Sequence, residues 1–137
     1  MRIRLEDLKQ KNLGSSYKTQ VVIKGKSIDI DIDPDDLEIG ETLEIVNKIL
    51  AGFEEYEAEA KQVLADNFLE TYNDNWREDN EPILTAKEFI QNLTLDGINF
   101  LSNTVDIFYT DNDMFDGHSL IAQSLDGEKF DSAMMYG

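Results

Sequence analysis

The stretch "SIDIDID", residues 27–33, constrains the fold more than any other part of the chain. Ile28, Ile30 and Ile32 alternate there with three aspartates. Because successive side chains on a strand point to opposite faces, this stretch has one apolar face and one anionic face. It therefore predicts a strand in a sheet that buries one of its two faces.

The three alternating aspartates, Asp29, Asp31 and Asp33, could also be read as a cation site. Alternate residues on a strand lie about 6.5–7 Å apart, so these carboxylates form a line. Calcium requires six to eight oxygens around one point, which a line does not provide. The pattern favours a solvated strand face, whose charge would also discourage pairing with another chain along that edge.

The residues around this stretch indicate further elements in the first half of the chain. Residues 19–33 predict an N-terminal β-hairpin that turns at Lys24-Gly25-Lys26, because glycine accepts a positive φ. Residues 1–18 are predicted to be a flexible, polar N-terminal segment in which a few apolar residues act as weak anchors. These anchors are Leu5, Leu8 and Leu13.

From residue 41 the apolar spacing changes to three, four and seven, which is typical of an amphipathic helix. We expect one helix or a helix pair over residues 41–74, with Gly52 as the break and the apolar stripe covering the sheet. The opposite, acidic face of this helical segment carries Glu54, Glu55, Glu57 and Glu59.

The second half of the chain predicts a loop, a short helix and several strands. Residues 73–82 form a polar loop around Trp76, and Thr85 stands three residues before Glu88, which is the spacing of a helix capping box. Four strand-like runs follow, and Asp126-Gly127 is a hairpin signal between the last two. These runs cover residues 94–101, 104–110, 118–125 and 129–136.

These elements together predict one α+β domain over residues 1–137. It consists of an N-terminal β-hairpin, a long helical segment, a short helix and a C-terminal antiparallel β-meander. The helices pack on one face of the sheet.

Charge is the strongest compositional signal. Seven bases and two acids give residues 1–26 a charge of +5, whereas five bases and 27 acids give residues 27–137 a charge of −22. Because residues 27–137 are this acidic, they repel nucleic acid and anionic membranes, and they attract cations or a basic protein. The alternative is that the charge only maintains solubility. We expect the basic residues near the N-terminus to pair with the chain's own acids.

The chain lacks the residues that several classes of chemistry require. The chain has no cysteine and one histidine, so it offers no disulfide, no thiolate metal site and no cysteine nucleophile. It contains no nucleophile-elbow, phosphate-loop or dinucleotide-binding motif. We therefore predict no catalytic residue and no cofactor, although paired carboxylates for glycoside hydrolysis remain open. No apolar run reaches membrane-spanning length, and no secretory signal is visible, which predicts a cytoplasmic protein.

The stretch "FYTDNDMFDGHSL", residues 108–120, contains the only histidine and the best candidates for a cation site. An EF-hand is excluded, because counting from Asp111 places Phe115, Asp116 and Ala122 where an oxygen ligand, a glycine and a glutamate are required. A looser acidic site stays open. Its candidate ligands are Asp111, Asp113, Asp116 and His118.

The favoured interpretation of this stretch is a turn between two neighbouring strands. Asp and Asn tolerate left-handed conformations, and Gly117 suits a positive φ. We expect His118 to begin the second strand. Phe115, an apolar residue in a polar loop, is expected to fold back onto the sheet or onto the Trp76 loop.

Residues 73–137 resemble a family of small, uncharacterised bacterial domains, in which a tryptophan precedes a short helix, strands and an acidic turn with a glycine–histidine pair. Relatives of this family occur among immunity proteins of bacterial toxin systems, so the resemblance implies a toxin-binding role. The positions that match are Trp76, Phe89, Phe115, Gly117, His118 and Gly137.

The functional expectation is a non-enzymatic, cytoplasmic, immunity-like domain that binds a cationic protein partner. The alternative is a divalent-cation-dependent protein or enzyme that uses the acidic loop from Asp111 to His118.

Overall fold

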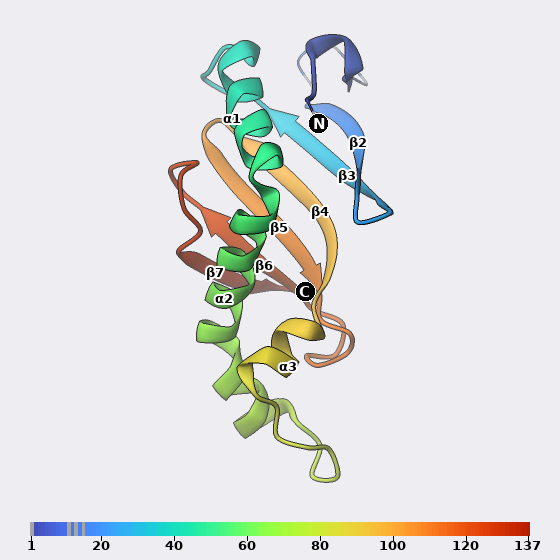
Figure 1. The fold of residues 1–137 in the computed structure, drawn as a ribbon, viewed down its shortest axis with the longest axis vertical. Helices are drawn as coiled ribbons and strands as arrows, with labels where there is room; N and C mark the ends of the chain where they lie inside the picture. Colours follow the sequence, from blue (N-terminus) through green and yellow to red (C-terminus); the bar gives the residue numbers. More distant parts are fainter. Residues whose placement is uncertain (1, 11, 13, 15) are drawn as a thin grey trace.

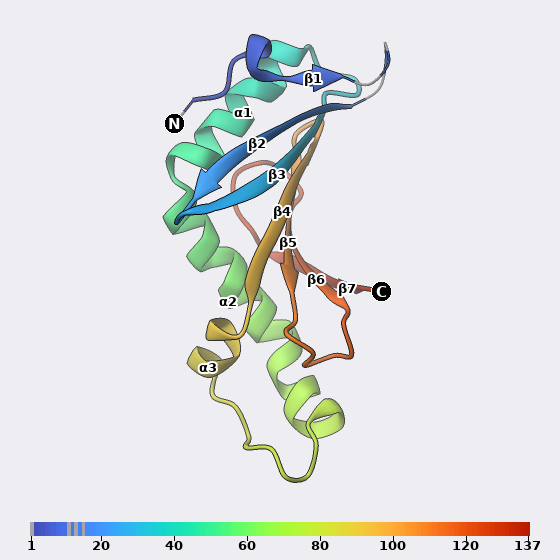
Figure 2. The ribbon, with the colours of Figure 1, turned by 90° about the vertical axis from the view of Figure 1, so that its right-hand side faces the viewer.

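A computed structural model gives the fold of the chain and describes residues 2–10, 12, 14 and 16–137. A seven-stranded sheet runs in the order β1 to β7, and the helices cover one of its faces (Figure 1; Figure 2). The strands are β1 (Lys9–Gln10), β2 (Tyr17–Ile23), β3 (Lys26–Asp33), β4 (Thr94–Leu101), β5 (Thr104–Thr110), β6 (Ser119–Ser124) and β7 (Ser132–Tyr136).

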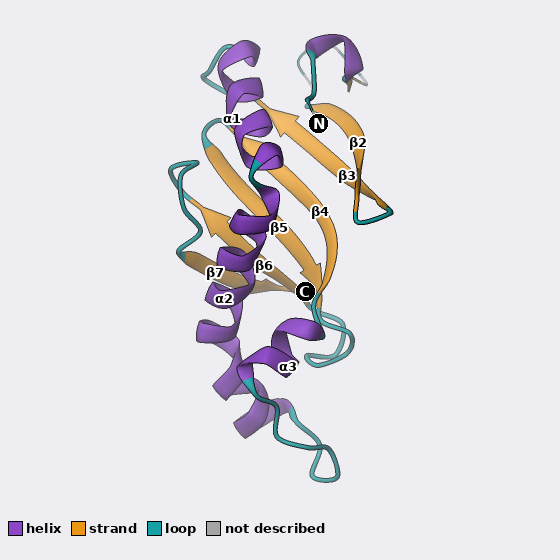
Figure 3. Ribbon diagram, viewed as in Figure 1, coloured by secondary structure: helices purple, strands orange, loops and turns teal. Residues whose placement is uncertain are grey.

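The predicted α+β class and order of elements are confirmed, as the helices and strands in Figure 3 show. Gly52 separates two helices, as expected, and the helix that follows it passes into a short π-helical turn. The helical elements are η1 (Leu5–Asp7), α1 (Ile39–Ala51), α2 (Phe53–Thr71), η2 (Tyr72–Trp76) and α3 (Ala86–Gln91).

The hairpin and the meander belong to one sheet, because β3 pairs with β4 in parallel. Asp29 lies opposite Gly97 and Ile30 lies opposite Ile98. The helices form the crossover connection that a parallel pair requires. The expectation that the aspartate strand is an edge is therefore wrong, since β3 lies between β2 and β4.

The alternation in β3 places its isoleucines in the core. Ile28, Ile30 and Ile32 are at most 1% exposed, and the aspartates between them point away from the helices. The turn before β3 has Lys24 and Gly25 at positive φ, so the predicted hairpin is confirmed.

The helices keep the predicted apolar stripe but differ from expectation on the acidic side. Val46 and Ile49 are fully buried in α1, and Leu64 is fully buried in α2. Glu57 was expected on the solvated face, but it is only 6% exposed. It occupies the buried side of α2 because it lies four residues after Phe53 and three before Ala60, both of which are buried.

The N-terminal residues are attached through Ile3, which is 5% exposed. The Asn47 side chain accepts a hydrogen bond from the Ile3 N–H at 2.6 Å and donates one to the Ile3 carbonyl at 2.9 Å. Leu5 is exposed and is not an anchor, Leu8 is half-buried, and Leu13 lies outside the described residues. Flexibility of residues 1–18 stays a prediction.

The predicted capping box of α3 is confirmed. Thr85 Oγ1 accepts from the Glu88 N–H at 3.2 Å, and the Glu88 carboxylate accepts from the Thr85 N–H at 2.9 Å. Because the backbone N–H of Thr85 stabilises the carboxylate, the pKa of Glu88 is lowered. Trp76 ends the π-helix η2, so the predicted loop is wrong for residues 73–76, whereas residues 77–82 form a loop as expected.

Candidate functional site

The acidic loop between β5 and β6 is organised around one buried carboxylate. Asp111 is 2% exposed, and one of its oxygens accepts a hydrogen bond from the Asp113 N–H at 2.9 Å. The other oxygen accepts from the N–H groups of Phe115 at 2.8 Å and Gly117 at 3.1 Å. The predicted turn between two neighbouring antiparallel strands is confirmed, and Asp111 holds it closed.

Phe115 folds back from this loop into the helical side of the molecule, as expected. Its side chain is fully buried, and its ring meets four other aromatic rings edge-on. The ring of Trp76 is the nearest, with centroids 5.4 Å apart. The other three rings belong to Phe68, Tyr72 and Phe89.

His118 belongs to the same cluster. It stands one residue before β6, which starts at Ser119, so the expectation that His118 begins the strand is wrong. Its Nδ1 lies within hydrogen-bond distance of the Phe115 carbonyl, and its ring meets Trp76 edge-on at 5.7 Å. Gly117 has the predicted positive φ of +86°, and a Cβ at Gly137 would collide with the His118 ring. The six positions that carry the family resemblance therefore all lie in or beside this loop cluster.

The candidate cation ligands do not converge. Asp113 and Asp116 are exposed, whereas the oxygens of Asp111 accept backbone N–H groups. Among residues 2–10, 12, 14 and 16–137, no three acidic or histidine side chains are placed to share one metal ion. A shallow hollow of about 310 Å³ lies beside the loop.

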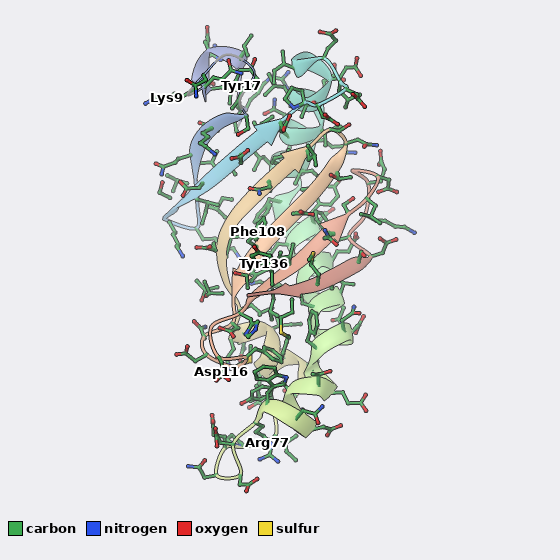
Figure 4. All side chains as sticks on the ribbon, turned by 180° about the vertical axis from the view of Figure 1, so that it is seen from behind. Lys9, Tyr17, Arg77, Phe108, Asp116 and Tyr136 are labelled. Carbon is green, nitrogen blue, oxygen red and sulfur yellow. The ribbon has the colours of Figure 1, made fainter. Side chains whose placement is uncertain are left out.

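A different surface has the shape of a binding site, namely the sheet face that points away from the helices. We call this the open face; Figure 4 views the molecule from this side. Strand register aligns its side chains in two rows across the sheet. The polar row is Lys9, Lys18, Asp31, Asn99, Asp106, Gln123 and Ser132, and the second row is Gln20, Asp29, Gly97, Phe108, Ile121 and Met134.

A hollow of about 780 Å³ lies on the open face over Gly97. Gly97 has no side chain to fill the space between its cross-strand neighbours Asp29 and Phe108. Further walls come from the β1–β2 side and from the chain just before Gly97. They include Lys9, Lys18, Gln20, Asp31 and Asp96.

The groups around this hollow are partly paired. Lys18 forms an ion pair with Asp31, and the Gln20 amide donates to Asp29 at 2.7 Å. Farther along the polar row, burial raises the pKa of Asp106, although the hydrogen bond from Gln123 opposes this effect. The hollow thus combines carboxylates on one side with an aromatic ring on the other.

The buried Glu57 is held at the interface of α2 with the sheet. It accepts a hydrogen bond from the Tyr109 hydroxyl at 3.2 Å, and Lys24 and Lys61 lie 3.5 and 3.9 Å from its other oxygen. Burial, with Glu57 as the second cause, raises the pKa of Tyr109 far above its usual range. This cluster was not predicted, although the spacing of Glu57 from Phe53 places Glu57 on the buried side of the helix.

The expected pairing of N-terminal bases with the chain's own acids is confirmed for several residues. Lys18 pairs with Asp31, Lys24 with Glu57, and Arg4 with Glu6 at 3.1 Å. Lys11 lies outside the described residues.

Comparison with known families places these observations in context. The family model described as "Uncharacterized protein conserved in bacteria (DUF2262)" matches residues 5–135. The chain belongs to this family. The match extends well beyond the resemblance over residues 73–137, because it also covers the residues of β1–β3 and of the long helices. Neither the curated proteins nor the solved structures include a match.

The helices of the structure can be compared with the length and hydropathy that a membrane-spanning helix requires. Across the described part of this DUF2262 chain, no helix is long and apolar enough to cross a bilayer.

Proposed function

We propose that this DUF2262 protein binds a basic protein and that the open face of its sheet is the contact surface. The hollow over Gly97 carries the proposal. Carboxylates at Asp29 and Asp31 lie on one side of it, and the ring of Phe108 lies on the other. A lysine or arginine side chain suits this setting, because carboxylates bind its charged end and an aromatic face attracts a cation.

The neighbouring apolar positions support an interface more than a small-molecule site. Phe108, Ile121 and Met134 are successive neighbours across β5, β6 and β7. Ile121 is 4% exposed although no helix of the described chain covers this face, whereas Met134 is 39% exposed. An apolar centre with a polar rim is the usual anatomy of a protein–protein contact.

The overall charge supports the same type of partner. A net charge of −17 gives the molecule a long-range field that speeds association with a cation, and added salt weakens it. The acidic face of α2 is a weaker candidate for the contact surface. Of its four predicted glutamates, Glu57 is buried and Glu59 accepts a hydrogen bond from the Phe130 N–H, which leaves Glu54 and Glu55.

The biological setting that we propose is immunity against a toxin in the bacterial cytoplasm. It rests on the resemblance to a family whose relatives occur among immunity proteins, and on the charge of −22 over residues 27–137. An immunity protein acts by occupying its toxin, so it requires a binding surface and no catalytic group of its own.

The test is photo-cross-linking in a bacterium that makes the protein. A photoreactive amino acid replaces Asn99 on the open face, or Ala58 on the exposed side of α2 as the matched control. We expect cross-links from position 99 to a protein with net positive charge, and none to that protein from position 58. Cross-links confined to position 58, or an acidic partner at position 99, would refute the proposal.

Binding to the captured protein then tests the hollow itself. Gly97→Leu fills the hollow, and Ala58→Leu adds the same atoms to the exposed side of α2. We expect Gly97→Leu to weaken binding at least about tenfold, the effect of losing about 1.4 kcal/mol, whereas Ala58→Leu leaves it unchanged. Circular dichroism and unfolding in urea verify that both variants are folded.

A further inference from the structure

The two edges of the sheet differ in how well they are protected against another strand. β1 has two residues, one of them Lys9, and both shortness and charge block strand addition. β7 has five residues, Ser132–Tyr136, with no charged residue and no proline. Within the described chain β7 pairs only with β6, so one side of its backbone faces outward.

The side chains of β7 also suit a partner strand. Met134 and Tyr136 stand on the open face and are 39% and 67% exposed, whereas Ala133 and Met135 pack against the core. Figure 4 shows Tyr136 and Phe108 on this face. A strand laid along β7 would therefore extend the apolar positions of the open face by one strand.

Acidic residues lie at both ends of β7. Asp131 directly precedes the strand, is exposed, and lies 4.0 Å from Lys129 Nζ in an exposed ion pair, which contributes little. At the other end Tyr136 pairs with Ser119, and the exposed Asp113 and Asp116 lie in the loop just before that residue. An extended segment along β7 would thus meet an uncharged centre, Asp131 with its partner Lys129 near one end, and the unpaired charges of Asp113 and Asp116 near the other, among the ion pairs described.

We infer that an extended segment of the basic partner adds to β7 as an eighth strand, with apolar or small residues at its centre and lysine or arginine at both ends. The inference rests on the proposed function for the charge of the partner. Main-chain hydrogen bonds would provide the binding, and the flanking charges would set the register.

A second copy of this chain fits the edge poorly. Each copy carries a net charge of −17. Antiparallel pairing of two β7 strands would place Asp131 of each copy near the acidic loop of the other. Like charges opposite one another are destabilising, so the ends of β7 favour a basic segment over self-association.

The probe is a capped nine-residue peptide, Lys-Lys-Val-Thr-Val-Thr-Val-Lys-Lys, added to the isotope-labelled full chain. Hydrogen exchange of individual backbone amides is followed by NMR. With the peptide at about ten times its dissociation constant, we expect exchange of the outward-facing amides of β7 to slow about tenfold. The amides of Lys9 and Gln10 in β1 serve as the internal reference and should not change.

Two controls separate strand addition from simple charge attraction. A peptide N-methylated at all five central residues keeps its charge and apolar side chains but cannot donate main-chain hydrogen bonds from its centre, and we expect no binding. Asp131→Asn combined with Asp116→Asn should weaken binding of the parent peptide several-fold. Asp35→Asn with Asp36→Asn, at the turn between β3 and α1, removes the same charge and should have no effect (Figure 1).

Equal binding of the N-methylated peptide, no binding of the parent peptide, or protection at β1 in place of β7 would each overturn strand addition. These outcomes leave the proposed function standing as long as position 99 cross-links to a basic protein. If cross-linking at position 99 fails as well, the proposed function falls with it.

Discussion

The two sides of the sheet use aspartate in opposite ways. On the helical side Asp111 is 2% exposed, and its two oxygens hold the backbone of one loop. On the open face Asp29 and Asp31 line a hollow and have as side-chain partners only Gln20 and Lys18 among the interactions described. Asp111 thus organises the fold, whereas Asp29 and Asp31 keep oxygens that face the hollow and could meet a partner.

This contrast predicts where substitutions act. On the helical side they should lower the free energy of unfolding and leave association intact in molecules that still fold. On the open face they should change association and leave stability nearly unchanged.

Phe115→Ala should be the most damaging single change. It removes a fully buried ring that touches four others, and such truncations cost about 3–5 kcal/mol. Unfolding in urea measures the loss. Phe108→Ala removes the same atoms from a half-buried site on the open face and should cost clearly less. Equal losses of unfolding free energy in Phe115→Ala and Phe108→Ala would show that the two faces do not differ in their contribution to stability.

Asp111→Asn tests whether the acidic loop is structural or a cation site. An amide keeps one acceptor but turns a donor toward backbone N–H groups, so we expect a loss of about 2 kcal/mol in unfolding free energy. The loss should be the same in calcium and in chelator. A loss that appears only when calcium is present would instead favour the divalent-cation function.

Much of this architecture could be predicted from local patterns. The alternation in β3 correctly placed Ile30 in the core, and Phe115 in a polar loop correctly indicated a side chain that folds back. These features depend on residues close together in the sequence. The turn geometry at Gly117 was predictable for the same reason.

Features that depend on distant residues were missed. The parallel pairing of β3 with β4 joins segments separated by three helices, and no local pattern encodes it. The hollow over Gly97 arises only when that glycine comes to lie between Asp29 and Phe108. Glu57 was recoverable, because it lies in the buried stripe of α2, but its charge suggested exposure.

Tyr109→Phe should have an intermediate effect that depends on pH. It removes the hydroxyl that donates to Glu57, which should cost about 1 kcal/mol near neutral pH. Burial raises the pKa of Tyr109 above its unfolded value of about 10. The stability that this shift contributes is complete below that value and is lost as the pH rises above it, because the unfolded chain then releases the proton more readily.

The expected signature is a smaller alkaline loss of stability in Tyr109→Phe than in the natural chain, measured by urea unfolding at a series of pH values. Tyr72 is a second tyrosine of the same kind in this chain. Its pKa is also raised, mainly by burial and to a smaller extent by the charge of Glu81. An identical alkaline loss in the natural chain and in Tyr109→Phe would show that titration of the Tyr109 hydroxyl does not contribute to that loss.

The smallest effect on stability is expected from replacing Asp29, Asp31 and Asp33 together with asparagine. The ion pair of Asp31 with Lys18 lies toward solvent, where such pairs contribute little, and asparagine can still accept from Gln20. The unfolding free energy should therefore change by no more than about 0.5 kcal/mol, and calorimetric titration should show no change in calcium affinity. Association with the cross-linked basic partner should nevertheless slow several-fold at low salt and lose part of its salt dependence, because three of the charges that attract it are gone. A stopped-flow measurement that finds the natural association rate would place the contact away from the hollow, whereas a large loss of stability would show that the open face organises the fold as the helical side does.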